Sequence, residues 1–171
     1  DALWVVNAGN SRAILSTEGT TTALSIDAGL ETDKECRSVW KRGQNIFDWQ
    51  ESRTVDQVGL SRGIGFDERT SGINPRGQII RYELNNLREG DNYLVMGSRG
   101  FFGEASSEQI TKRVNSLARV GCFPHEIAKD LVANSLKAGV QDNATVIVVN
   151  FDEPPLVKTE LSGGDRPRSI Q

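Results

Sequence analysis

Three short segments of the chain are apolar at almost every position: residues 3–6, 93–96 and 145–151. Such short, continuous runs are typical of strands buried on both faces, and the β-branched segment 145–151 is the clearest of the three. Polar turns join residues 3–6 to 13–15, and 78–84 to 93–96, so each pair predicts a β-hairpin. We therefore expect a sheet with central, fully buried strands.

Three other segments have the periodicity of helices with one apolar face: residues 31–42, 106–121 and 124–139. Ser106 and Gln109 have the spacing of a capping box, which predicts a helix start. Because the two later helices each carry a single apolar stripe, we expect both to lie on the outer face of a sheet.

The periodic pattern has two interruptions. Residues 68–77 have the polar composition of an exposed loop, within a longer stretch that is polar and glycine-rich. From residue 152 the chain is rich in proline, glycine and charge, which predicts a disordered tail or linker over 152–171. This leaves one domain over residues 1–151.

Composition narrows the possible functions. The chain has 171 residues, 37% of them apolar and 25% charged, which is typical of a globular domain. The net charge of −3 argues against a nucleic-acid partner, and no apolar run approaches the roughly 18 residues of a membrane span. Two cysteines far apart and a single histidine indicate reduced thiols rather than a zinc site. We therefore expect a cytoplasmic protein, or one of another reducing intracellular compartment.

The chain starts at an aspartate without a secretory signal, so we expect a fragment or a processed product.

Small polar turns adjoin three of the predicted strands, and we expect these turns to gather at one end of the sheet. They are residues 9–12, 97–100 and 141–143. In a metal-dependent hydrolase such positions carry aspartates, because Mg²⁺ and Mn²⁺ prefer carboxylate oxygens. Asp142 fits that chemistry, whereas Asn10 is neutral and Arg99 is a permanent cation that repels a divalent ion.

Five segments, in this order along the chain, resemble the motifs of one enzyme family. They are residues 3–13 (ending G-N-S-R-A), 24–27 (L-S-I-D), 58–65 (V-G-L-S-R-G-I-G), 93–103 (Y-L-V-M-G-S-R-G-F-F-G) and 142–149 (D-N-A-T-V-I-V-V). The family is that of the metal-dependent protein phosphatases of the 2C type. The resemblance covers the C-terminal part of the family domain, without its D-G-H-G-G metal motif. It implies an α+β fold, a β-sandwich flanked by helices in four α-β-β-α layers, with this chain supplying the later part.

The resemblance also implies a degenerate metal site. Asn10 and Arg99 stand where the family has metal-binding aspartates, and Asp142 is the residual metal ligand of this region. The family uses two metal ions to activate a bridging water that attacks phosphoserine or phosphothreonine. A cation at a core ligand position opposes such binding by several kcal/mol, as an order of magnitude. We therefore expect an inactive, pseudophosphatase-like binding or regulatory module, with no catalytic residue and no cofactor.

Two other functions stay open. One is an active serine/threonine phosphatase that is completed by an N-terminal segment and binds Mg²⁺ or Mn²⁺. The other is a structural subunit of a larger assembly. In each case open strand edges predict a protein partner, or a preceding segment, that completes the sandwich.

The individual site residues also have alternative roles. Asp142 could serve in a turn before the last strand instead of binding metal. Arg99 could bind a phosphate or an acidic partner, although we favour a pairing with Asp142. Arg12 and Arg62 have the context of structural residues.

Overall fold

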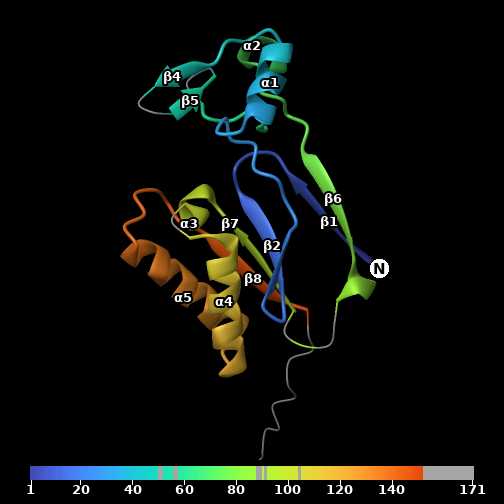
Figure 1. Ribbon diagram of the computed structural model, residues 1–171, viewed down its shortest axis with the longest axis vertical. Coiled ribbons are helices and arrows are strands. Elements are labelled where there is room, and N and C mark those ends of the chain that lie inside the picture. Colours follow the sequence, from blue (N-terminus) through green and yellow to red (C-terminus); the bar gives the residue numbers. More distant parts are fainter. Residues whose placement is uncertain (50–51, 56–57, 88–89, 91, 104, 152–171) are drawn as a thin grey trace, which may run out of the picture.

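The structure, a computed structural model, describes residues 1–49, 52–55, 58–87, 90, 92–103 and 105–151 (Figure 1). The strands in this part of the chain are β1 (Ala2–Asn7), β2 (Arg12–Thr17), β3 (Thr20–Ala23), β4 (Phe47–Trp49), β5 (Ser52–Thr54), β6 (Gln78–Glu83), β7 (Asn92–Gly97) and β8 (Val146–Asn150). The helices are α1 (Asp33–Lys41), α2 (Glu68–Ser71), the 3-10 helix η1 (Leu84–Asn86), α3 (Arg99–Phe102), α4 (Ser107–Arg119) and α5 (Pro124–Lys137). The predicted tail over 152–171 lies outside the described residues.

Two antiparallel sheets and a helical layer make up the main body. One sheet has the order β3-β2-β7-β8, and the other is a ribbon of β1 and β6. An apolar core that includes Ala13, Leu15 and Leu94 lies between them, with Leu3 and Val5 of the ribbon packed against it. The helices α4 and α5 cover the opposite face of the larger sheet (Figure 1). The expected α+β sandwich is therefore present, and the described residues supply three of its four expected layers.

The helix pair follows the sequence pattern closely. Ser106 accepts from the backbone N–H of Gln109, whose side chain accepts from the N–H of Ser106, so the capping box is confirmed. Ile110, Val114 and Ile127 are buried against the larger sheet. The single apolar stripe on each helix is therefore used as predicted, to cover one face of the sheet.

Both predicted hairpins are wrong, because the strands of each pair belong to different sheets. β1 pairs with β6, with Val5 opposite Ile80. β2 pairs with β3 and with β7, with Ile14 opposite Val95. The turn after β1 carries the chain from one sheet to the other, and the same holds between β6 and β7. β2 and β7 are apolar on both faces. Because of these crossings, the ribbon covers one face of the two strands and the helices cover the other.

The prediction that the first and last strands are buried on both faces is also wrong. In β1, Trp4 is 59% exposed and Val6 66% exposed, because no layer of the described chain covers the outer face of the ribbon. In β8, Val146 and Val148 pack toward the helices, but Ile147 is 53% exposed on the opposite face. β8 is the edge strand of the larger sheet, and the two-stranded ribbon does not extend far enough to cover the face of β8 that carries Ile147.

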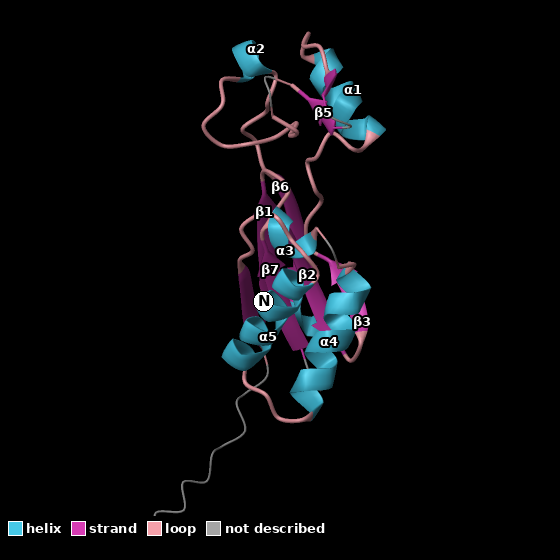
Figure 2. Cartoon of the chain, turned by 90° about the vertical axis from the view of Figure 1, so that its left-hand side faces the viewer, coloured by secondary structure: helices cyan, strands magenta, loops and turns pink. Residues whose placement is uncertain are grey.

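Residues 29–77, which we call the connecting segment, form a small unit of their own. Figure 2 shows α1, α2 and β5 beyond one end of the main body. The core of the connecting segment consists of Leu30, Cys36, Val39, Val55 and Ile73. The predicted exposed loop over 68–77 is wrong, because α2 forms there and Ile73 is fully buried.

None of the described helices is long and apolar enough to span a membrane.

The outer face of the ribbon predicts self-association of the 171-residue chain. Trp4, Val6 and Ile79 form this ribbon face, and all three are more than half exposed. We expect sedimentation velocity to show concentration-dependent association, because contact between two copies of the chain would remove these apolar side chains from water. Val6→Lys with Ile79→Lys should reduce the association, whereas Leu136→Lys, at an exposed apolar site on α5, should not. A wild-type monomer that unfolds in one sharp transition would contradict this prediction.

Candidate functional site

Two of the three predicted turns line one cavity. It has a volume of about 320 Å³ and lies where β2 begins and β7 ends. The lining residues are Asn10, Arg12, Asp27, Gly29, Glu31, Thr32, Arg99, Phe102 and Gly103. The sequence prediction that Asn10 and Arg99 come together is therefore confirmed. The connecting segment forms the remaining wall through Gly29, Glu31 and Thr32, which the sequence patterns did not indicate.

The third turn packs against the second, through hydrogen bonds of Ser98 and a close approach of Gly100. Ser98 Oγ donates to the carbonyl oxygen of Asn143 at 3.1 Å, and the N–H of Ser98 donates to the carbonyl oxygen of Thr145 at 3.0 Å. Gly100 lies so close that a Cβ there would be 2.5 Å from the Asn143 carbonyl oxygen. Only glycine fits this contact, so Gly100 holds α3 directly against the turn that precedes β8.

The favoured pairing of Arg99 with Asp142 is absent. Asp142 is exposed, and its Oδ1 accepts from the backbone N–H of Asn143 at 2.7 Å. Arg99 is exposed on the cavity, and within the described part of the chain it has no carboxylate partner. The Asp142 carboxylate is thus turned to its own backbone, while the Arg99 guanidinium lies at the cavity.

Arg12 is structural, as predicted. Its Nη2 lies 2.6 Å from Oδ2 of Asp27, and its Nε donates to Oδ1 of the same carboxylate at 3.3 Å. Its Nη1 donates to Ser107 Oγ at 3.2 Å, and the guanidinium lies 4.9 Å from the ring centre of Phe102. This set of contacts joins β2 to α3 and α4 and neutralises Asp27.

The cavity therefore keeps two charges that are not paired with each other. They are the guanidinium of Arg99 and the carboxylate of Glu31, which folds back over Gly29. Within the described ranges, no cluster of three or more His, Cys, Asp or Glu side chains could hold a metal ion. A divalent cation would meet one unpaired carboxylate and one guanidinium, so these residues by themselves do not fit Mg²⁺ or Mn²⁺.

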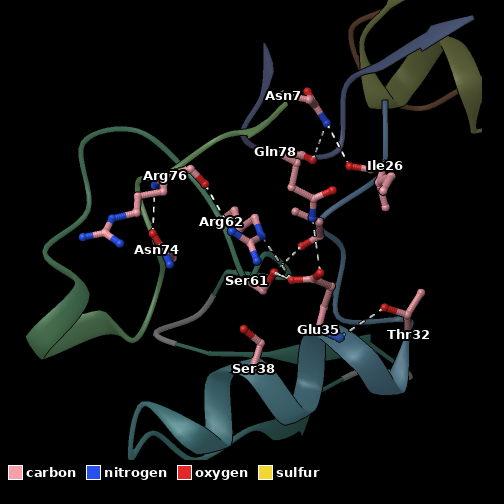
Figure 3. Close-up of polar contacts among 12 residues, drawn as sticks. Asn7, Ile26, Thr32, Glu35, Ser38, Ser61, Arg62, Asn74, Arg76 and Gln78 are labelled. Atoms are coloured by element: carbon pink, nitrogen blue, oxygen red, sulfur yellow. Dashed lines mark hydrogen bonds and ion pairs between the residues drawn. The ribbon is translucent and has the colours of Figure 1, made fainter. Parts of the chain in front are cut away.

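A buried carboxylate beside the cavity escaped the sequence reading. Glu35 on α1 is 2% exposed, and Figure 3 shows Ser61, Arg62 and Gln78 directed toward it. Ser61 Oγ donates to Oε2, Gln78 Nε2 donates to Oε1 at 3.3 Å, and Arg62 Nε lies 3.5 Å from Oε2. Thr32 Oγ1 accepts from the Glu35 N–H at 3.4 Å and caps the helix.

The position of Glu35 could have indicated this role. It precedes Cys36 and lies one turn before Val39, on the apolar stripe of the predicted helix. A charged residue on a buried stripe requires partners, and the Ser-Arg pair of the 58–65 motif supplies two of them. The cluster fixes the start of α1 and with it the cavity wall at Gly29, Glu31 and Thr32.

Arg42 strengthens the same unit from the other end of α1. Its Nε donates to the Gly72 carbonyl oxygen at 2.6 Å and its Nη2 to that of Ser61 at 3.0 Å. Partial burial lowers the pKa of the Arg42 guanidinium, while the carboxylate of Glu68 acts in the opposite direction. The connecting segment is therefore held together by side chains that bond to backbone carbonyls.

A family model and the curated relatives that this chain matches point to the same family of proteins. A family model described as "Protein phosphatase 2C" matches residues 1–144. Probable protein phosphatase 2C 27 of Arabidopsis thaliana is 28% identical over 172 residues, covering 97% of this chain and 44% of the relative. Probable protein phosphatase 2C 47 of Oryza sativa subsp. japonica is 30% identical over 177 residues, covering 99% and 45%. The chain thus spans less than half the length of these curated relatives.

Solved structures share the fold at lower identity. A phosphatase from Toxoplasma gondii superimposes with a TM-score of 0.69 at 19% identity, over 90% of this chain and 50% of that one. A sex determining protein of C. elegans superimposes with a TM-score of 0.75 at 17% identity, over 90% and 37%. Both establish the fold of the described residues.

The buried cluster predicts a large effect of Glu35→Ala. The substitution leaves Arg62 without its carboxylate, and loss of one partner of a buried pair costs about 3–5 kcal/mol. Amide hydrogen exchange in α1 should therefore become on the order of a hundredfold faster or more. Asp33→Ala, which removes an exposed pair with Arg53, should change exchange by less than about tenfold. Equal effects of the two substitutions would show that the cluster does not hold α1.

Proposed function

The chain belongs to the protein phosphatase 2C family, and on that premise we propose that it is a catalytically inactive member, a pseudophosphatase-like domain that acts as a binding or regulatory module. The observation that carries the proposal is Arg99. It occupies the position of a metal-binding aspartate in the family-like segment 93–103, and its guanidinium lines the same cavity as Asn10.

Electrostatics explain why Arg99 opposes the family reaction. A divalent ion about 4 Å from a guanidinium is disfavoured by roughly 8 kcal/mol at an effective dielectric constant of 20. Asn10 adds no negative charge to offset this, and Asp27 is already neutralised by Arg12. The two-metal mechanism requires carboxylates that attract both ions and lower the pKa of a bridging water. Among the described side chains that line this cavity, Glu31 alone is a carboxylate without an ion pair, and the charge of Arg99 offsets it.

Asp142 has a minor part in this proposal. Its turn packs against Gly100, so the carboxylate lies next to the cavity without lining it. It stays a candidate ligand for the alternative function, an active phosphatase whose other ligands come from the rest of the protein. Family membership supports that alternative, and metal binding distinguishes the two.

We further propose that the rest of the protein, or a partner protein, completes the sandwich. Two observations support this: the ribbon face is uncovered, and Ile147 on β8 faces an open side of the sandwich. The relatives are more than twice as long as their matched part, which gives a source for the missing layers. A structural role in a larger assembly would use the same surfaces.

Metal titration tests the proposed inactivity. In the protein that contains this chain, isothermal titration calorimetry with Mn²⁺ should show no site in this cavity, and phosphopeptides should not be hydrolysed. Asn10→Asp with Arg99→Asp should create measurable Mn²⁺ binding, because the two substitutions remove one positive charge, add two negative charges and so lower the net charge of the cavity by three units.

Asn10→Asp with Arg119→Asp is the matched control. It changes the net charge of the protein by the same amount, but its Arg→Asp substitution is at an exposed residue outside the cavity lining. It should leave Mn²⁺ affinity far below that of the first variant. Tight Mn²⁺ binding by the wild-type protein, together with phosphopeptide turnover, would overturn the proposal in favour of an active enzyme.

A further inference from the structure

A crevice between the helices α4 and α5 lies outside the candidate site. Its volume is about 430 Å³, which is within the range for small-ligand sites. The two helices lie side by side, with α3 at one end of the pair (Figure 1), and residues of all three helices line the crevice. None of these residues lines the cavity of Arg99, so the crevice is a separate feature that the proposed function does not use.

The inner wall of the crevice is apolar. Phe101, Ile110 and Leu131 contribute to it, and each of them is 1–4% exposed. Ala105 and Ala138 also line the crevice, and their small side chains leave room between the helices. A ligand can therefore bury an aromatic ring or a similar apolar body against this wall.

Three exposed polar side chains, those of Gln109, Arg113 and Asn134, form the rim, and each is held in place by hydrogen bonds. Arg113 donates from Nε and Nη2 to the two carboxylate oxygens of Asp130, at 2.7 and 2.6 Å. Asn134 donates from Nδ2 to Asp130 Oδ2 at 2.8 Å. Gln109 accepts from the N–H of Ser106 through Oε1, also at 2.8 Å. The rim is therefore ordered before any ligand binds.

Each rim side chain keeps one polar atom for a ligand. Among the described residues, Gln109 Nε2, Arg113 Nη1 and Asn134 Oδ1 have no hydrogen-bond partner. Two donor groups and one acceptor are complementary to the C=O and NH₂ of a primary amide. Because other bonds already hold these side chains, little side-chain entropy is lost when a ligand binds.

The charges at the rim cancel, and this favours a neutral ligand. Among the described lining residues Arg113 alone is charged, and its ion pair with Asp130 neutralises it. The hydrogen bonds from Arg113 lower the pKa of Asp130, so the pair stays ionised at neutral pH. An anionic ligand would compete with Asp130 for the guanidinium, and a cationic ligand would lie beside a like charge.

We infer that this crevice binds a neutral small molecule that carries a primary amide on an aromatic ring or a similar apolar body. The ring lies against the apolar wall, the amide oxygen accepts from Gln109 Nε2 and Arg113 Nη1, and the amide NH₂ donates to Asn134 Oδ1. The cavity of Arg99 takes no part in this binding, which is therefore expected whether the domain is an active or an inactive phosphatase.

Four probes that share one ring test the inference: benzamide, benzoate, benzylamine and toluene. Each is titrated at neutral pH into the protein that contains this chain, and ¹H–¹⁵N NMR follows the side-chain amide signals of Gln109 and Asn134. We expect benzamide to shift both signals, with a dissociation constant on the order of millimolar for so small a ligand. The other three should bind about five- to tenfold more weakly, because each lacks a hydrogen bond or adds an unpaired charge.

A substitution that fills the crevice tests the location. Ala138→Leu should weaken benzamide binding about tenfold or more, because the larger side chain occupies the space of the ring. Ala133→Leu is the matched control, since it makes the same change on the same helix at a residue outside the crevice lining, and it should leave the affinity unchanged. Both alanines are exposed, so both variants are expected to fold.

Gln109→Glu tests the recognition of the amide without loss of the helix cap. A glutamate there can still accept from the N–H of Ser106, because it is the usual partner in a capping box. It replaces the Nε2 donor by a negatively charged oxygen. The ratio of benzylamine affinity to benzamide affinity should therefore rise about tenfold.

Three results would each overturn the inference. The first is the absence of shifts at Gln109 and Asn134 with benzamide at tens of millimolar. The second is equal binding of any of the other three probes, which would show that the rim does not recognise a neutral amide. The third is unchanged benzamide affinity in Ala138→Leu, which would place the bound probe elsewhere.

Discussion

The strand pair β2 and β7 carries apolar side chains on both faces, and the rest of the structure depends on covering them. Ile14 and Val95, opposite each other in register, pack under the helices, while Leu15 and Leu94 pack against the ribbon. A strand pair with two apolar faces requires a layer on each side. This requirement explains why β1 leaves for a second sheet instead of forming a hairpin with β2.

The candidate site is a consequence of this arrangement. Antiparallel pairing places the start of β2 beside the end of β7, with Arg12 opposite Gly97. The turns that flank those two residues therefore meet, and they bring Asn10 and Arg99 to one cavity. The pairing of β2 with β7 thus places a neutral amide and a cation in one cavity, and the connecting segment adds the carboxylate of Glu31.

The connecting segment contributes the other wall of the cavity through a different kind of interaction. Its core is small, and the buried carboxylate of Glu35 joins α1, the 58–65 motif and the start of β6. A buried charge is costly unless its partners are complete, so such a cluster specifies one arrangement of the three segments. The position of Glu31 relative to Arg99 follows from that arrangement.

The amino-acid sequence by itself determined the local features. The capping box at Ser106, the apolar stripes of the helix pair and the family motifs, with Asn10 and Arg99, could all be read from it, because they depend on neighbouring residues. Only the tertiary structure decided strand pairing, the exposure of Val6 and Ile147, and the missing contact between Arg99 and Asp142. These depend on which distant segment lies across a given face, and an apolar run has the same pattern whether or not a layer covers it.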